Sequence, residues 1–217
     1  MSQSSAAAKH APAVRQKKQM RVDILRERLP RIPPGKLNAA QKKVAAEISA
    51  GPRKDVRGPF VPMMRSPGLT GPTQALGAYI RWGVKLPLHL AEMAGLMAAR
   101  DWSCQFEWAV HVPHAIKGGL HPDTIDALAE CRRPEKMKKD EAIVYDFVNE
   151  LLKNRGVSDP TYARAVKHFG EESVVDLIGV VGYYAMIAML MNVARTSPPS
   201  GMPTLPALPL YSRPVAK

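Results

Sequence analysis

The stretch LPLHLAEMAGLMAARDWSCQFEWAVHVPHAIKGG, residues 86–119, decides the fold of this chain. It predicts two consecutive helices. The first, Leu86–Arg100, has a proline in the first turn, where proline is tolerated. The second, Ser103–Gly118, is ended by a pair of glycines in the manner of a helix C-cap. Both helices are largely apolar, so the few polar side chains that they carry need an explanation.

Helices are expected over the rest of the chain as well, because no segment alternates with period two over the length of a strand. The other expected helices are Val22–Leu29, Leu37–Ser49, Thr70–Trp82, Pro122–Glu130, Asp140–Asn154, Ser158–Phe169 and a long apolar helix from about Glu171 to Arg195. The predicted fold class is therefore all-α, a compact multi-helix bundle with extended N- and C-terminal arms.

The positive charge is concentrated at the N-terminus. The formal net charge is +12 over 217 residues. Residues 1–57 hold fourteen Lys and Arg against four Asp and Glu, which leaves seventeen against fifteen for the remainder. We expect a basic, flexible arm at 1–35, an all-α domain at 36–197 and a proline-rich extended tail at 198–217. The arm lacks interleaved aromatic residues, so a solubilising tail is favoured over a nucleic-acid partner.

The sequence favours a cytoplasmic location. The first 22 residues contain no long apolar run, as a secretory signal would, although an Arg-rich, acid-poor start is also compatible with a mitochondrial presequence. Two cysteines, Cys104 and Cys131, suit a reducing compartment. The uncharged run Leu177–Met191 has fifteen residues, whereas a membrane span needs about 20. We expect no membrane span and a helix buried against other helices or a neighbouring subunit.

A polar stripe is predicted on the helix Ser103–Gly118. At 100° per residue, Cys104, Glu107, His111 and His114 fall within an arc of about 80°. A thiol, a carboxylate and two imidazoles on one stripe of an apolar helix are expected to face a shared pocket or interface. Pro113 removes one backbone hydrogen bond, and a kink there would change where His114 points.

The preceding helix carries only two polar side chains between Leu86 and Ala99, His89 and Glu92, which lie on the same face. A carboxylate among Leu and Met side chains is costly unless it is paired or protonated, and either state tunes a proton donor or acceptor. If the two helices lie side by side, Glu92 or Glu107 would orient His111 or exchange protons with it. A histidine near Cys104 would favour the thiolate.

Each of these residues also has a purely structural interpretation. Cys104 alone is typical of a small buried apolar residue, and His111 of a core histidine with satisfied hydrogen bonds. Glu107 is compatible with a helix surface, and Glu92 with an interhelical salt bridge. No HExxH, CxxC or Gly-rich phosphate motif is present, although Glu107 and His111 at i,i+4 could bind a metal weakly. We therefore expect no metal and no cofactor.

The polar residues of the two helices resemble a known pattern, that of the carboxymuconolactone decarboxylase and alkylhydroperoxidase D-like family. The motif that carries the resemblance is Glu92, eleven residues, Cys104-x-x-Glu107-x-x-x-His111, then Gly119-Leu120 and a helix that begins HPDTIDAL. The run FEWAVH is similar to the aromatic-Glu-Trp-x-x-His signature of uncharacterised bacterial members. The resemblance covers roughly residues 37–200. It implies a compact all-α fold that assembles as trimers, hexamers or dimer-based homo-oligomers.

The resemblance also assigns roles. In the alkylhydroperoxidase D branch a glutamate, a Cys-x-x-Cys pair and a histidine form a proton relay. Glu92 matches the glutamate, Cys104 the first cysteine and His111 the histidine, whereas Glu107 replaces the second cysteine. Without that thiol no dithiol–disulfide cycle can operate unless another thiol such as Cys131 resolves a sulfenic acid. The decarboxylase branch uses acid–base residues on a small lactone acid without a cofactor.

Three functions follow as hypotheses. The first is a cofactor-free enzyme doing proton-transfer chemistry, decarboxylation or a related reaction, on a small lactone or carboxylic acid. In it Glu92 and His111 are acid and base, and Glu107 orients His111 or binds substrate. The second is a peroxidase that uses Cys104 and an external thiol. The third is a non-catalytic oligomeric binding protein. The residues expected to bind substrate or to line its pocket are His89, Arg100, His114, Trp102, Trp108, Phe60, Met63 and Met64.

Overall fold

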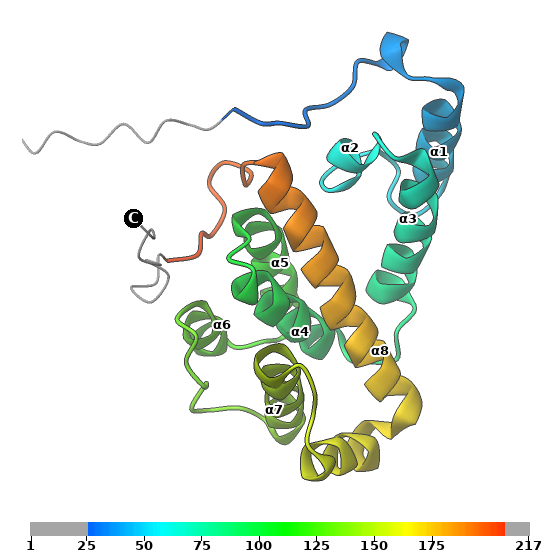
Figure 1. Ribbon diagram of the computed structural model, residues 1–217. Helices are drawn as coiled ribbons and strands as arrows, with labels where there is room; N and C mark the ends of the chain where they lie inside the picture. Colours follow the sequence, from blue (N-terminus) through cyan, green and yellow to red (C-terminus); the bar gives the residue numbers. More distant parts are fainter. Residues whose placement is uncertain (1–25, 207–217) are drawn as a thin grey trace, which may run out of the picture.

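The computed structural model describes residues 26–206, and within that range it contains helices and no strand, which confirms the all-α prediction (Figure 1). A short 3-10 helix, Pro34–Lys36, comes first. The helices that follow are α1 (Ala39–Ala50), α2 (Phe60–Met63), α3 (Pro67–Trp82), α4 (Leu88–Asp101), α5 (Gln105–Gly118), α6 (Pro122–Ala129), α7 (Lys139–Asn154) and α8 (Asp159–Ala194).

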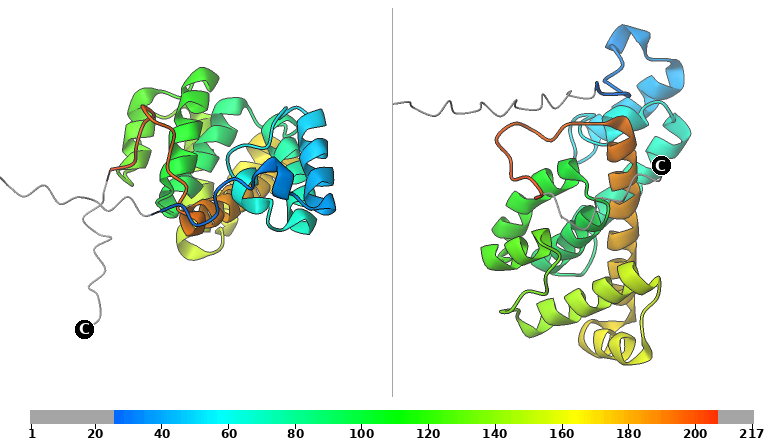
Figure 2. Two further views of the ribbon diagram at one scale, coloured as in Figure 1. Left: turned by 90° about the horizontal axis from the view of Figure 1, so that it is seen from above. Right: turned by 60° about the vertical axis from the view of Figure 1, so that its left-hand side comes forward.

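The long helix α8 organises the molecule. It packs against α3 on one side and against α4, α5 and α7 on the other. Figures 1 and 2 show α1, α2 and α3 grouped on one side of α8 and the helices α4 to α7 on the other. The largest part of one cavity wall comes from α3, α5 and α8, so α8 joins the two groups of helices at this cavity.

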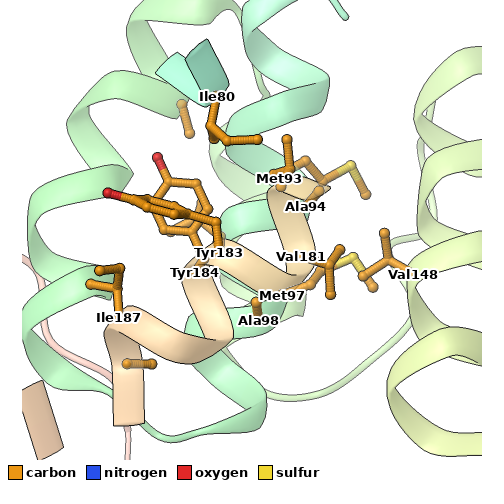
Figure 3. Close-up of a cluster of buried hydrophobic side chains, with 14 of the residues drawn as sticks. Ile80, Met93, Ala94, Met97, Ala98, Val148, Val181, Tyr183, Tyr184 and Ile187 are labelled. Carbon is orange, nitrogen blue, oxygen red and sulfur yellow. The ribbon is translucent and has the colours of Figure 1, made fainter. Parts of the chain in front are cut away.

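Helix α4 forms the centre of the core. Every residue from Glu92 to Arg100 is buried, because α5, α7 and α8 all pack around this helix. Met93 and Met97 of α4 lie against side chains of α8 in the cluster shown in Figure 3. Full burial of a large aliphatic side chain stabilises the fold by about 1.5–3 kcal/mol relative to exposure.

The two helices expected at Ser158–Phe169 and Glu171–Arg195 join at Gly170. That residue has φ 81° and ψ 163°, so it interrupts the regular helical backbone within α8. Glycine alone adopts this backbone region at little cost because it has no Cβ atom. The break therefore lies between the two helices that the sequence predicts.

The short helix expected at Val22–Leu29 is wrong for its described part. Residues 26–29 are not helical, and residues 22–25 lie outside the described range. The reason is tertiary: the backbone N–H of Arg28 donates to the carbonyl of Ala194 at 2.8 Å, at the end of α8. This hydrogen bond replaces the local one that a helix would need.

Helix α8 is long and apolar enough to cross a membrane by length and composition, and 56% of its most apolar 18-residue window is buried inside the fold. A core helix of a globular protein meets the same criterion. The outer face of α8 exposes Val175, Ile178, Met189 and Val193. The sequence predicts burial against other helices or a neighbouring subunit, and within one chain this outer face of the helix remains exposed.

The described part of the proline-rich tail, residues 198–206, lies on the helical body. Leu205 is buried, and both polar groups of its backbone are bonded to the side chain of Gln105. The N–H of Leu205 donates to Gln105 Oε1 at 2.8 Å, and Gln105 Nε2 donates to the Leu205 carbonyl at 2.9 Å. The tail is thereby attached at the start of α5, a hundred residues away in sequence.

Candidate active site

A cavity of about 540 Å³ opens between the two groups of helices. Its walls come from residues 53–60, from α3, α5 and α8, and from Pro199 of the tail. The apolar part of the wall includes Phe60, Trp82 and Phe106, and the polar part includes arginine, histidine, tyrosine and glutamate side chains. A largely apolar cavity with a few convergent polar groups is the usual form of a small-molecule site.

A chain of three buried side chains in contact, one pair of them hydrogen-bonded, ends at this cavity. His111 Nδ1 lies 2.7 Å from Glu92 Oε2, and His111 Nε2 lies 3.5 Å from Glu107 Oε2. All three residues are almost completely buried, with exposed fractions of 5% or less. Glu107 and His111 line the cavity, whereas Glu92 lies behind the imidazole. Nδ1 of the imidazole therefore faces Glu92, and Nε2 faces Glu107.

The packing of α4 on α5 creates this chain of groups. Glu107 and His111 are one turn apart on α5, and Glu92 comes from the middle of α4. The two helices approach closely at Gly118, where a Cβ atom would lie only 3.0 Å from the backbone nitrogen of His89. The structure thus brings Glu92, Glu107 and His111 together, as the interpretation of the sequence required.

Burial sets the protonation of Glu107. It raises the pKa of this carboxyl group above its ordinary range, and the charges of His111 and Arg81 offset only part of that effect. A carboxyl group with a raised pKa can donate a proton at a pH where an ordinary glutamate is already ionised. Glu107 is therefore suited to exchange a proton with a molecule in the cavity, with His111 behind it.

Two tyrosines of α8 complete the inner wall. Tyr184 packs edge-on against His111, with ring centroids 4.6 Å apart, and burial raises its pKa well above the ordinary value. Burial also raises the pKa of Tyr183 to about 12. Both phenols stay neutral near pH 7, so they offer hydrogen bonds and apolar surface to a bound molecule and no negative charge.

Cys104 departs from the sequence prediction. It is the N-cap residue of α5, just before the helix begins at Gln105, and it does not line the cavity. The side chain is buried in the apolar core, and this burial raises the pKa of its thiol to about 11. The expected thiolate stabilised by a nearby histidine is wrong, because an apolar environment disfavours the charged form.

This environment predicts slow alkylation of Cys104. With a pKa of about 11, roughly one thiol in a thousand is ionised at pH 8, and access is blocked by burial. Iodoacetamide at pH 8 is expected to modify the exposed Cys131 in the native protein and to spare Cys104, whereas both react in denaturant. Peptide mapping by mass spectrometry measures this, and equal labelling rates in the native protein would contradict the assignment.

Of the residues expected to bind substrate, two reach the cavity. Phe60 forms part of its wall, and His114 lines it despite the proline at position 113. His114 Nε2 lies 2.8 Å from Arg81 Nη2, so this nitrogen accepts a hydrogen bond from the guanidinium. Burial, with a contribution from the charge of Arg81, lowers the pKa of His114. His114 is therefore a neutral acceptor near pH 7 that fixes Arg81.

The polar members of the remaining set lie elsewhere. His89 faces α7, with Nε2 3.5 Å from Asp140 Oδ2 and no hydrogen-bond partner among the described residues. Arg100 is buried, donates to the carbonyl of Pro206 at 3.2 Å and lies 3.4 Å from Cys131 Sγ. Because α4 is surrounded by other elements, these two side chains contact α7, the tail and Cys131, and neither lines the cavity.

The apolar members of that set are structural too. Met63 at the end of α2 and Met64, which follows it, are buried in the core and are not part of the cavity wall. Trp108 is on the side of α5 that faces α6 and the tail, and Trp102 is 40% exposed at the end of α4. The sequence showed their apolar character but not which side of each helix faces the cavity.

Several residues of the site were not predicted from the sequence: Arg53, Arg57, Arg81, Trp82, Tyr183 and Tyr184. Two signals were present. The proline-punctuated connector after α1 carries several basic residues with no acidic run beside them. The Tyr183-Tyr184 pair lies within the apolar part of α8, where a buried hydroxyl group needs a polar neighbour. Neither signal identifies a site by itself, because the cavity forms only when α3 packs against α8.

Within residues 26–206, no three or more His, Cys, Asp and Glu side chains are grouped so that they could hold a metal ion.

The fold and the site together define a class of protein. It is an all-helical protein in which a buried chain of a carboxyl group, an imidazole and a second carboxyl group ends at a cavity.

The fold is similar to that of a protein of known structure. A protein of unknown function from Agrobacterium tumefaciens, whose description links it to AhpD and antioxidant defence, matches with a TM-score of 0.54 and 20% sequence identity. The match covers 62% of this chain and 93% of that protein. The chain therefore has an AhpD-like fold. No protein-family model matches the sequence, and no curated protein matches it either.

Proposed function

We propose that the protein is a cofactor-free enzyme of the carboxymuconolactone decarboxylase-like type that transfers protons to or from a small lactone or carboxylic acid. The observation that carries the proposal is the buried chain Glu92–His111–Glu107, which ends at a cavity large enough for such a molecule. Buried carboxyl and imidazole groups in direct contact are typical of general acid–base catalysis.

Each residue has a role in this reaction. When the substrate loses CO₂, the electron pair of the broken carbon–carbon bond passes into the conjugated lactone carbonyl as an enolate. The carboxyl group of Glu107 delivers a proton to carbon, and His111 Nε2 returns a proton from solvent to Glu107. Glu92 accepts the hydrogen bond of an Nδ1–H group and so holds the imidazole in the tautomer that this exchange needs. The overall change is consumption of one proton and release of CO₂.

A peroxidase function has less support. The AhpD-named structural neighbour is the observation in its favour. Reduction of a hydroperoxide needs a reactive thiolate, and Cys104 is buried outside the cavity wall with a pKa raised to about 11. A purely structural role of the polar stripe is also less well supported, because Glu107 and His111 line an open cavity.

The test is a screen of unsaturated lactone acids in D₂O, in which mass spectrometry and NMR follow CO₂ release and the incorporation of deuterium at carbon. Wild type and Cys104→Ser are expected to turn over at similar rates. His111→Asn is expected to be slower by a factor of about 10²–10⁴, the usual contribution of a general acid or base.

The same screen separates the alternatives. If hydroperoxide produces a dimedone-trapped sulfenic acid at Cys104, and Cys104→Ser removes a peroxidase activity, the proton-transfer proposal is wrong. Full turnover by a folded His111→Asn protein contradicts it equally.

A further inference from the structure

The cavity contains three arginines, and no acidic side chain among the described residues forms an ion pair with any of them. Arg53, Arg57 and Arg81 all line it. Four arginines outside the cavity do pair with acids, among them Arg133 and Arg164, which both pair with Asp146, whereas others, such as Arg65, bond to backbone carbonyl groups. A cluster of cations in a partly enclosed site favours an anion from outside the chain.

Arg53 is held in place by aromatic rings. Its guanidinium carbon lies 4.5 Å from the ring centroid of Phe60 and 5.3 Å from that of Trp82. Tyr183 is close to the same guanidinium, within reach of a hydrogen bond. Stacking fixes the plane of the group while leaving its edge available for a bidentate contact with an oxyanion.

The Nε atom of Arg53 is buried and has no hydrogen-bond partner among the described residues. A buried donor of a charged group is costly when it is unpaired. Burial accordingly lowers the pKa of Arg53, although the group remains a cation at neutral pH. An oxyanion bound at this edge would satisfy the donor and offset the cost of desolvating the charge.

Arg81 is fixed as well. It donates to His114 Nε2 at 2.8 Å, and its guanidinium carbon lies 5.7 Å from the ring centroid of Trp82. This contact uses one of five N–H donors, and the others remain for a ligand. The nearest carboxyl group in the cavity wall, Glu107, has a raised pKa and so contributes less negative charge than an ordinary glutamate.

We propose that Arg53 and Arg81 form a recognition site for the carboxylate of a small planar organic acid. The aromatic walls Phe60, Trp82 and Phe106 favour a flat molecule, and the two guanidinium groups bind its carboxylate so that the remainder extends toward Glu107. Arg57, exposed at the rim, attracts anions to the opening. This inference rests on the proposed function and narrows its substrate class.

Calorimetric titration of the full chain tests the inference with three probes: benzoate, its neutral analogue benzamide, and inorganic phosphate. Benzoate is expected to bind at least about tenfold more tightly than benzamide, because charge-assisted hydrogen bonds to arginine are lost with the neutral molecule. Phosphate shares the oxyanion chemistry but not the flat apolar part, so it is expected to bind more weakly than benzoate.

Benzoate affinities of arginine variants show whether binding takes place at the cavity. Arg53→Gln is expected to weaken benzoate binding about tenfold or more, and Arg81→Gln is a second variant in case the first fails to fold. The matched control is Arg133→Gln, because Arg133 also stacks on an aromatic ring, that of Tyr145 at 5.0 Å, but lies outside the cavity. The control is expected to bind benzoate like the wild type.

Several results would overturn the inference: equal affinity for benzoate and benzamide, equal effects of Arg53→Gln and Arg133→Gln, or tighter binding of phosphate than of benzoate. Failure of the proposed function looks different. If benzoate binds through Arg53 but no lactone acid is turned over, the recognition site stands without the reaction. If turnover depends on His111 but is unaffected in both arginine variants, the reaction stands without this site.

Discussion

Replacement of Glu107 by glutamine is expected to lower turnover by a factor of about 10²–10⁴ and at the same time to stabilise the fold at neutral pH. The loss of activity follows because an amide cannot deliver the proton that a general acid supplies. The gain in stability follows because burial opposes ionisation of Glu107 and raises its pKa. The ionisable carboxyl group at this position therefore lowers the stability of the fold while it supports the proposed reaction.

The effect of Glu107 on the stability of the fold depends on pH. A carboxyl group with a pKa raised on folding binds more protons in the folded state than in the unfolded state, so its contribution to stability falls as pH rises from its ordinary value of 4.5 through the raised value. The difference in free energy of unfolding between Glu107→Gln and wild type should therefore be small below about pH 4.5 and grow as pH rises.

Thermal or urea unfolding from pH 4 to pH 8 measures this difference. The control is Glu172→Gln, because Glu172 is exposed and pairs with Lys85 on the surface. Exposed ion pairs contribute about 0–1 kcal/mol, so the control should change little over the same range. A Glu107→Gln protein that is less stable than wild type at pH 8 would show that the ionised carboxylate is needed by the fold.

Replacement of Gly77 by alanine is expected to destabilise the protein by about 1–3 kcal/mol, the usual cost of overpacking a core. A Cβ atom at this position would lie 2.6 Å from Cζ of Tyr183 and 2.7 Å from Nη2 of Arg53. Tyr183 is buried, so its ring has little room to move. The Tm should fall by about 2–4 °C for each kcal/mol in a protein of this size.

The matched control is Gly182→Ala, one residue before Tyr183. A Cβ atom at Gly182 meets no atom within 4 Å, so alanine there should stabilise the helix by about 0.5–1 kcal/mol through its better helix propensity. The two substitutions add the same methyl group and should shift Tm in opposite directions. Gly77→Ala should also weaken benzoate binding, because Arg53 would be displaced, and a protein with unchanged Tm and affinity would contradict the packing described here.

The sequence predicts most of the helices because their boundaries carry local signals. Pro122 begins α6, and Gly119, with φ 97°, ends α5 in the left-handed conformation. It also identifies Glu92, Glu107 and His111 as candidates for one site, since a carboxylate in an apolar helix needs a partner, but only the structure shows that both carboxyl groups lie beside His111. The predicted helix begins at Ser103, two residues before the true start of α5 at Gln105, so Cys104 was placed on the helical stripe although it is the N-cap residue.

The rest of the site could not be predicted from local patterns. Arg53 and Tyr183 are 130 residues apart and meet only because Gly77 allows α3 to approach α8. Likewise, the directions of His89 and Arg100 depend on which helix packs against each side of α4. These are consequences of tertiary packing, for which periodicity along a single helix gives no signal.

The position of α8 in the chain has a consequence for synthesis in the cell. The cavity wall begins with residues 53–60 and is completed by Tyr183, Tyr184 and Ile187. About 100 residues separate α3 from these side chains, which corresponds to about 5–20 s of translation at about 5–20 residues per second. During that interval the nascent chain exposes the apolar surfaces of α3 and α4 that α8 later covers. The newly made protein is therefore most exposed to chaperones and proteases just before its binding site is complete.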